Sequence, residues 1–207
     1  MDGQIIADMK QLEEYVNNMD NILSALFTQQ SEINTSYNKA TQCWCDRISQ
    51  DTGNALSFAG IQTEQFNNYL MDLLGKLNVM YSIMTEGYLE GSWEGSLGKY
   101  ELESRPNIKE STKTMINGTH VDSIIDFERA LASYIEKTRN CIKSTQKALE
   151  SATSWNDGLR RKTDEQTAEF TQNMNQCMTY LENQLEWVTR RRVYFQEAFE
   201  AMGHVTE

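Results

Sequence analysis

The residues of this chain that could do chemistry are few and scattered. Only two histidines occur, His120 and His204, and neither belongs to a recognisable catalytic triad. The sequence has no phosphate-binding glycine loop, no dinucleotide-binding turn and no His-Glu-x-x-His pair. Most of its aspartates and glutamates fall on polar faces of predicted helices, where we expect solvated charges. The sequence therefore predicts a protein that is not an enzyme and needs no cofactor or metal.

The four cysteines are the remaining candidates for metal or redox chemistry. Cys43 and Cys45 are separated by one residue, with no second close pair and no nearby histidine, so they do not form a metal-ligand pattern. We expect buried, reduced thiols. Cys141 and Cys177 lie part-way along two predicted helices, and a disulfide between them is the alternative for an exported protein.

The most informative spacing belongs to tryptophan. Trp44 and Trp155 lie 111 positions apart, and each is followed two residues later by an aspartate. Those aspartates are Asp46 and Asp157. The same offset superposes further pairs: Ile48 on Leu159, Thr52 on Thr163, Tyr69 on Tyr180 and Leu70 on Leu181. We interpret the chain as a duplicated helical hairpin; the alternative is two unrelated hairpins that share a tryptophan.

Long segments with helical periodicity flank both tryptophans. The first, residues 5–43, lacks proline and glycine, and its apolar residues recur at helical spacing. The others cover about residues 47–86, 122–154 and 157–202, and we expect Phe58 and Phe66 on the core-facing side of the first of these. Asp46 and Asp157 would act as N-caps, because their carboxylates accept hydrogen bonds from free amides of the next turn. We predict an all-α protein in which two long antiparallel hairpins, residues 1–86 and 119–207, form a four-helix bundle.

The segment between the hairpins, residues 87–118, has a different composition. It is rich in glycine and holds the only proline, Pro106. Alternating stretches at 99–103 and 112–116 suggest a linker that could contain a short β-hairpin. Within it, Trp93 stands two residues before Gly95, and this pair is a candidate for a third tryptophan motif.

The charge of the chain restricts its partners. The formal net charge is -11, and the N-terminal hairpin is its acidic half. Such a surface repels phosphate backbones and anionic lipid, so we expect no nucleic-acid binding. The one basic run is Arg190, Arg191 and Arg192. We interpret it as a solvated turn near the end of the last helix, where cations are favoured, with a docking patch for an acidic partner as the alternative.

The sequence also limits the routes of export and membrane insertion that we expect for this protein. No apolar run approaches twenty residues, so we expect no membrane insertion. The N-terminal residues lack the basic and apolar regions of a Sec signal peptide. We therefore expect a protein of the bacterial cytoplasm, or one that is secreted by another route.

A long helix, a tryptophan turn and a second helix together resemble the WXG superfamily of type VII secretion, here as a tandem, fused pseudo-dimer. The resemblance implies hairpins that pair into four-helix bundles and act as secreted substrates, effectors or helpers that accompany toxins to a secretion ATPase. It also implies that Trp44 and Trp155 pack near the hairpin tips or meet the secretion machinery.

Two departures from the family pattern matter. Both turns carry aspartate where the family has glycine. The family's export signal, a tyrosine followed four positions later by an acidic residue, is not matched, because Ala198 follows Tyr194 and Ser92 follows Tyr88 at that spacing. A helper or adaptor that borrows its partner's signal agrees better with this sequence than an autonomous substrate.

Three functions follow as hypotheses. The first is a non-enzymatic helper, adaptor or co-secreted partner that binds a helical effector or a sibling hairpin, and with it a secretion ATPase. The second is a structural or scaffold bundle of a phage or appendage, which would self-associate. The third, an effector whose toxicity lies in the linker, has little chemistry to support it.

Overall fold

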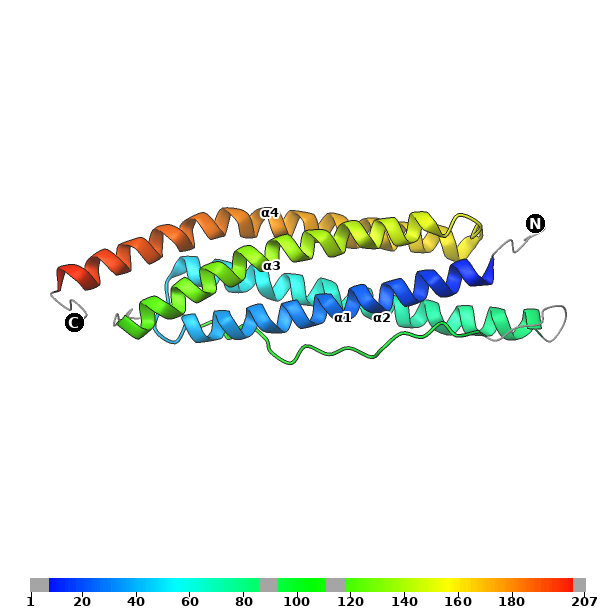
Figure 1. The fold of residues 1–207 in the computed structure, drawn as a ribbon, viewed down its shortest axis with the longest axis horizontal. Helices are drawn as coiled ribbons and strands as arrows, with labels where there is room; N and C mark the ends of the chain where they lie inside the picture. Colours follow the sequence, from blue (N-terminus) through cyan, green and yellow to red (C-terminus); the bar gives the residue numbers. More distant parts are fainter. Residues whose placement is uncertain (1–7, 86–92, 111–117, 203–207) are drawn as a thin grey trace. The chain divides into compact units, whose positions relative to one another are not determined.

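The computed structural model describes residues 8–85, 93–110 and 118–202 and contains four α-helices in these ranges (Figure 1). They are α1 (Met9–Ala40), α2 (Arg47–Thr85), α3 (Gly118–Ser151) and α4 (Gly158–Ala201). The predicted all-α, four-helix-bundle fold is confirmed. The predicted helix ends differ by a few residues; α3, for example, begins at Gly118 rather than at residue 122.

The apolar faces predicted for the helices are largely buried. Leu12, Leu23, Leu131 and Leu181 are completely inaccessible to solvent, as a core-facing stripe requires. Phe58 is an exception, because 43% of this residue is exposed although the periodicity placed it in the core. At this level of α2 the buried residues are instead the neighbouring Ala55, Leu56 and Ala59.

The chain divides into two compact units, and each unit contains part of every helix. The first unit holds the turn at Trp155, and the second unit holds the turn at Trp44. The predicted division into hairpins 1–86 and 119–207 follows the order of the sequence and stays a prediction. The first unit comprises residues 1–27, 62–101 and 140–174, and the second comprises residues 28–61, 102–139 and 175–207.

Aromatic pairs organise the core of the first unit. The rings of Phe66 and Phe170 stack nearly parallel with centroids 4.1 Å apart, which joins α2 to α4. The Tyr69 hydroxyl lies 2.7 Å from Thr163 Oγ1 and forms a second link between the same two helices. An aromatic pair such as Phe66 and Phe170 contributes about 1 kcal/mol beyond the stabilisation that comes from its buried area.

The second unit has a buried polar network inside its apolar core. Gln30 Nε2 donates to Asn34 Oδ1 and to the Leu56 carbonyl, both at 3.0 Å, and the Tyr134 hydroxyl donates to Gln30 Oε1. Asn34 Nδ2 donates to the carbonyl of Ser104 at 2.8 Å. The network therefore connects α1, α2, α3 and the linker through groups that would be costly to leave unpaired.

The described part of the linker, residues 93–110, contains no strand, so the predicted hairpin strand at 99–103 is wrong. The other predicted stretch, 112–116, lies outside the described residues. The physical reason is that α1, rather than a second strand, supplies the hydrogen-bond partners of the linker backbone. The amides of Glu94, Gly98 and Glu103 donate to side chains of α1.

The side chains of α1 that bind the linker are spaced three, four or eleven residues apart, and these steps keep them on one face of the helix. They accept linker amides or donate to linker carbonyls over almost the whole helix. We call this set the linker stripe; its members are Glu13, Asn17, Asp20, Ser31, Asn34 and Asn38.

Candidate functional site

The turn between α1 and α2 buries its tryptophan completely. Trp44 has no exposed surface, and its ring centroid lies 6.2 Å from that of Phe127 on α3. Its indole Nε1 has no hydrogen-bond partner among the described residues. The indole therefore contributes apolar packing inside the second unit and presents no surface to a partner.

Asp46 caps α2, as the sequence predicted. Its Oδ1 accepts the Ser49 amide at 3.0 Å, and the Asp46 amide donates to Ser49 Oγ at the same distance. This reciprocal pair is a capping box in which serine takes the position usual for glutamate. The other carboxylate oxygen, Oδ2, lies 2.8 Å from Arg191 Nε as an ion pair without hydrogen-bond alignment.

The turn between α3 and α4 buries Trp155 to 2% exposure and uses its aspartate differently. Asp157 Oδ1 accepts the Arg160 amide at 2.9 Å as the cap of α4, and it also accepts Trp155 Nε1 at 3.0 Å. The Trp155 ring packs on Tyr15 of α1, with centroids 5.7 Å apart. One carboxylate oxygen thus satisfies both the helix end and the indole.

The two turns share one packing arrangement. Each indole lies against an aromatic ring from the other predicted hairpin: Trp44 against Phe127, and Trp155 against Tyr15. This reciprocity is what a duplicated hairpin would produce. Since both rings are buried, a role for these two indoles in direct partner binding would need the turns to open.

Trp93, the candidate third motif, has a different setting. It begins the extended segment 93–110 and is not followed by a helix, and its ring lies 5.8 Å from that of Tyr81 on α2. The ring is partly exposed. Trp93 therefore lies in the part of the linker that belongs to the first unit, and it does not form a helix-to-helix turn like the other two.

The arginine run does not lie in the last turn of its helix, because α4 continues to Ala201. Arg191 pairs with Asp46, and Arg192 Nε donates to Glu128 Oε2 at 2.5 Å. Arg190 instead lies over the Trp187 ring, 4.7 Å from its centroid. Two of the three charges thus neutralise acids of the second unit, which reduces what remains for an acidic partner.

All four cysteines are present as thiols. Cys177 Sγ donates to the Ala55 carbonyl at 3.3 Å, and burial raises the pKa of this thiol to about 12. Burial also raises the pKa of Cys43. A raised pKa keeps a thiol protonated at neutral pH and makes it a poor nucleophile and metal ligand.

The part of the chain that the structure describes contains no group of three histidine, cysteine or acidic side chains placed to hold a metal. Lys76 Nζ donates to Asp72 Oδ2 at 2.6 Å and lowers the pKa of this carboxyl. His120 lies in the first turn of α3, and His204 lies outside the described residues.

An exposed aromatic face on α4 is the feature that our sequence reasoning missed. Tyr180, Trp187 and Tyr194 are 44%, 49% and 57% exposed, and all three belong to the second unit. Their spacing of seven residues places them along one side of the helix. The seven-residue spacing of these aromatic residues is present in the sequence, but helical periodicity was used only to predict the buried face. We call this set the aromatic stripe.

Comparison with protein-family models, with curated proteins and with solved structures found no match to this chain. Within the described ranges, no helix is both long and apolar enough to cross a membrane.

Proposed function

We propose that this chain is a non-enzymatic interaction protein of a type VII-like secretion system, acting as a helper, adaptor or co-secreted partner of a helical effector. The observation that carries the proposal is the aromatic stripe, because three large rings at heptad spacing offer a helix-sized apolar surface. Tyrosine and tryptophan are the residues that most often anchor protein interfaces.

The two tryptophan turns support the secretion part of this proposal. A pair of long helices joined by a tryptophan turn resembles the WXG hairpin, and the chain has two such turns with reciprocal packing. The buried indoles would then stabilise the hairpins, while the aromatic stripe would meet the partner. The compartments that follow are the bacterial cytoplasm and, for a co-secreted partner, the medium.

The first experiment measures the protein in the culture supernatant of its native host, with and without a functional secretion ATPase. A cytoplasmic protein serves as the lysis control. Release that requires the ATPase supports a co-secreted partner. Retention in both strains, together with no binding to helical proteins encoded beside it, would remove the secretion role.

A second experiment tests the stripe itself with the double variant Trp187→Ala/Tyr194→Ala. Binding to a co-expressed helical partner should fall at least tenfold, with little change in melting temperature, because both rings are already exposed. Val79→Ala is the matched control, since Val79 is 61% exposed on α2 of the first unit. Equal loss in both variants would show that the stripe has no special role.

A structural scaffold is the second candidate function, and the same stripe supports it. Tyr180 and Tyr194 lie symmetrically about Trp187, so two antiparallel copies of α4 could place like rings together. This alternative predicts concentration-dependent self-association that the double variant abolishes. Light scattering across a hundredfold range of concentration distinguishes it from a monomer that binds a different chain.

A further inference from the structure

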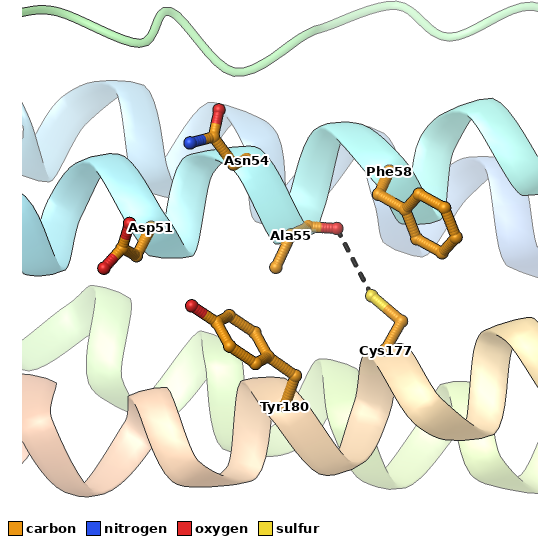
Figure 2. A pocket seen from close by; sticks show the side chains of 6 residues that line it. All are labelled: Asp51, Asn54, Ala55, Phe58, Cys177 and Tyr180. Carbon is orange, nitrogen blue, oxygen red and sulfur yellow. Dashed lines mark hydrogen bonds between the residues drawn. The ribbon is translucent and has the colours of Figure 1, made fainter.

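A pocket of about 340 Å³ lies between α2 and α4 within the second unit (Figure 2). In Figure 2 the Tyr180 ring extends from α4 toward α2, with its hydroxyl end on the side of Asp51, and the Phe58 ring stands at the opposite end. The lining residues are Asp51, Asn54, Ala55, Phe58, Cys177 and Tyr180.

The internal repeat explains why this pocket is open. The offset of 111 pairs Ala55 with Gln166 and Cys177 with Phe66, so the second unit has a small residue at two places where the first unit has a large one. In the first unit, Phe66 stacks on Phe170, and the corresponding groove has only about 170 Å³. The pocket is thus a difference between two otherwise related sites.

The repeat also explains why the Tyr180 ring is available. Its counterpart Tyr69 is half-buried and hydrogen-bonded to Thr163 in the first unit. Tyr180 is 44% exposed and lines the pocket instead. Phe58, where the first unit has Glu169, adds a second exposed ring. Two aromatic faces therefore border a site whose floor is a methyl group and a neutral thiol.

The charge at the pocket is negative. Asp51 is the one acidic residue among its lining residues, and the raised pKa of Cys177 keeps that thiol protonated. Asp51 lies 3.7 Å from Arg47, but the Arg47 side chain is 92% exposed. Surface pairs of this kind contribute little and are easily exchanged, so the carboxylate is accessible to another cation.

We propose that this pocket binds the cationic side chain of a lysine or arginine from a partner helix. The methylene stem would pack between the rings of Phe58 and Tyr180, and the charged end would meet the Asp51 carboxylate. The net charge of -11 would favour the approach of a basic segment. This proposal rests on the proposed function, because it assigns the chemistry by which the partner is recognised.

The aromatic stripe gives the bound helix its direction. Tyr180 belongs both to the pocket and to the stripe, so a helix lying along Trp187 and Tyr194 can place one side chain between α2 and α4. Arg190 stands about 15 Å along α4 from Tyr180, since each residue advances a helix by about 1.5 Å. The partner should therefore carry a basic residue and, roughly ten residues away, an acidic one.

The test uses the full-length protein, isotope-labelled and titrated with n-butylguanidinium and n-butylammonium, with 1-butanol as the neutral probe. Amide and side-chain shifts of Ala55, Phe58 and Cys177 should move with the cations. Their affinity should exceed that of butanol at least tenfold, which is about 1.4 kcal/mol. Equal affinity for butanol, or shifts that spread over many surface sites, would overturn the proposal.

Two variants locate the effect. Asp51→Asn keeps the shape of the pocket and should weaken cation binding about tenfold without changing butanol binding. Ala55→Gln copies the residue of the other unit and should abolish both. The matched control is Glu169→Gln, which removes a carboxylate from the corresponding groove of the first unit and should change neither. Unchanged cation affinity in Asp51→Asn would refute the role of this carboxylate.

The outcomes separate this inference from the secretion role. ATPase-dependent release without cation binding would remove the pocket and leave the proposed function. Cation binding without release, and without a neighbouring helical partner, would remove the secretion role and leave a pocket for basic side chains.

Discussion

The two tryptophan turns lie 111 residues apart and share the Trp-x-Asp pattern, yet they satisfy their polar groups differently. At the α3–α4 turn, Asp157 accepts both a helix amide and the indole of Trp155. At the α1–α2 turn, Asp46 caps its helix and pairs with Arg191, and the indole of Trp44 has no acceptor in the described structure. Both turns have a buried indole ring and an aspartate N-cap. We infer that these two features, rather than the indole hydrogen bond, are common requirements of the turns.

The surroundings of the two turns differ as well. Gln11, near the start of α1, accepts hydrogen bonds from the amide and hydroxyl of Ser154 and so covers the Trp155 turn. The end of the linker covers the Trp44 turn, where Cys45 Sγ donates to the Glu110 carbonyl at 3.0 Å. One turn is therefore closed by a helix and the other by an extended segment.

The largest effect should come from removing either ring. Trp44→Ala and Trp155→Ala should each lower the free energy of unfolding by about 3–5 kcal/mol, because each leaves a large cavity. Urea denaturation followed by circular dichroism measures this loss. Trp187→Ala is the exposed control and should change stability by less than about 0.5 kcal/mol. A loss below about 1 kcal/mol at either turn would show that its ring is not a core element.

The two capping aspartates should differ in cost. Asp46→Ala should lose about 1 kcal/mol, the usual value of an N-cap. Asp157→Ala should lose about 2–3 kcal/mol, since it also leaves the buried Trp155 N–H without an acceptor. Thermal unfolding of the two variants side by side tests this order, and equal losses would contradict the dual role of Asp157.

Exchange of tryptophan for phenylalanine sharpens the same comparison. Trp155→Phe gives up the bond to Asp157, whereas Trp44→Phe gives up no hydrogen bond and removes an unpartnered donor. We expect Trp155→Phe to be the more destabilising by about 1 kcal/mol. Chemical denaturation provides the measurement. The reverse order would indicate that Trp44 has a partner in solution.

The smallest effect concerns the ion pair of Asp46 with Arg191. Arg191→Ala should cost less than about 1 kcal/mol, because both side chains are partly exposed. The loss should shrink as salt is raised, since screening weakens the pair in the parent protein. At the other turn Arg160 pairs with Asp164 rather than with the capping Asp157, its Nε lying 2.9 Å from Asp164 Oδ1, so the loss in Arg160→Ala should shrink with salt as well. A salt-independent loss in Arg191→Ala would assign its role to packing.

The sequence predicted the elements of this fold well and their assembly less well. The four helices and both caps follow from periodicity and from Asp46 and Asp157, which are local signals. Phe58 was misplaced because the helical face alone cannot show that a small pair, Ala55 and Cys177, meets across α2 and α4. The linker was misjudged for a similar reason: alternation indicates an extended chain, but the partner of that chain is a helix.

In the candidate site, too, the local features could be predicted from the sequence, whereas the tertiary contacts could not. Trp44 and Trp155 were visible as a repeated motif, and their burial depends on Phe127 and Tyr15, which are distant in sequence. The aromatic stripe was visible as a heptad period but was not read as a surface. The contacts of Arg191 and Arg192 depend on tertiary structure and could not be read from three consecutive basic residues.

The linker stripe of α1 has a consequence for how this sequence can change. The contacts that α1 makes to residues 94–107 are mostly to backbone amides and carbonyls, which every residue type except proline supplies. Even Pro106 is accommodated, because the bonds on either side use the carbonyl of Arg105 and the amide of Asn107. Related chains should thus tolerate wide substitution in the linker, while Asn34 and Asn38 on the helix beneath it should vary little.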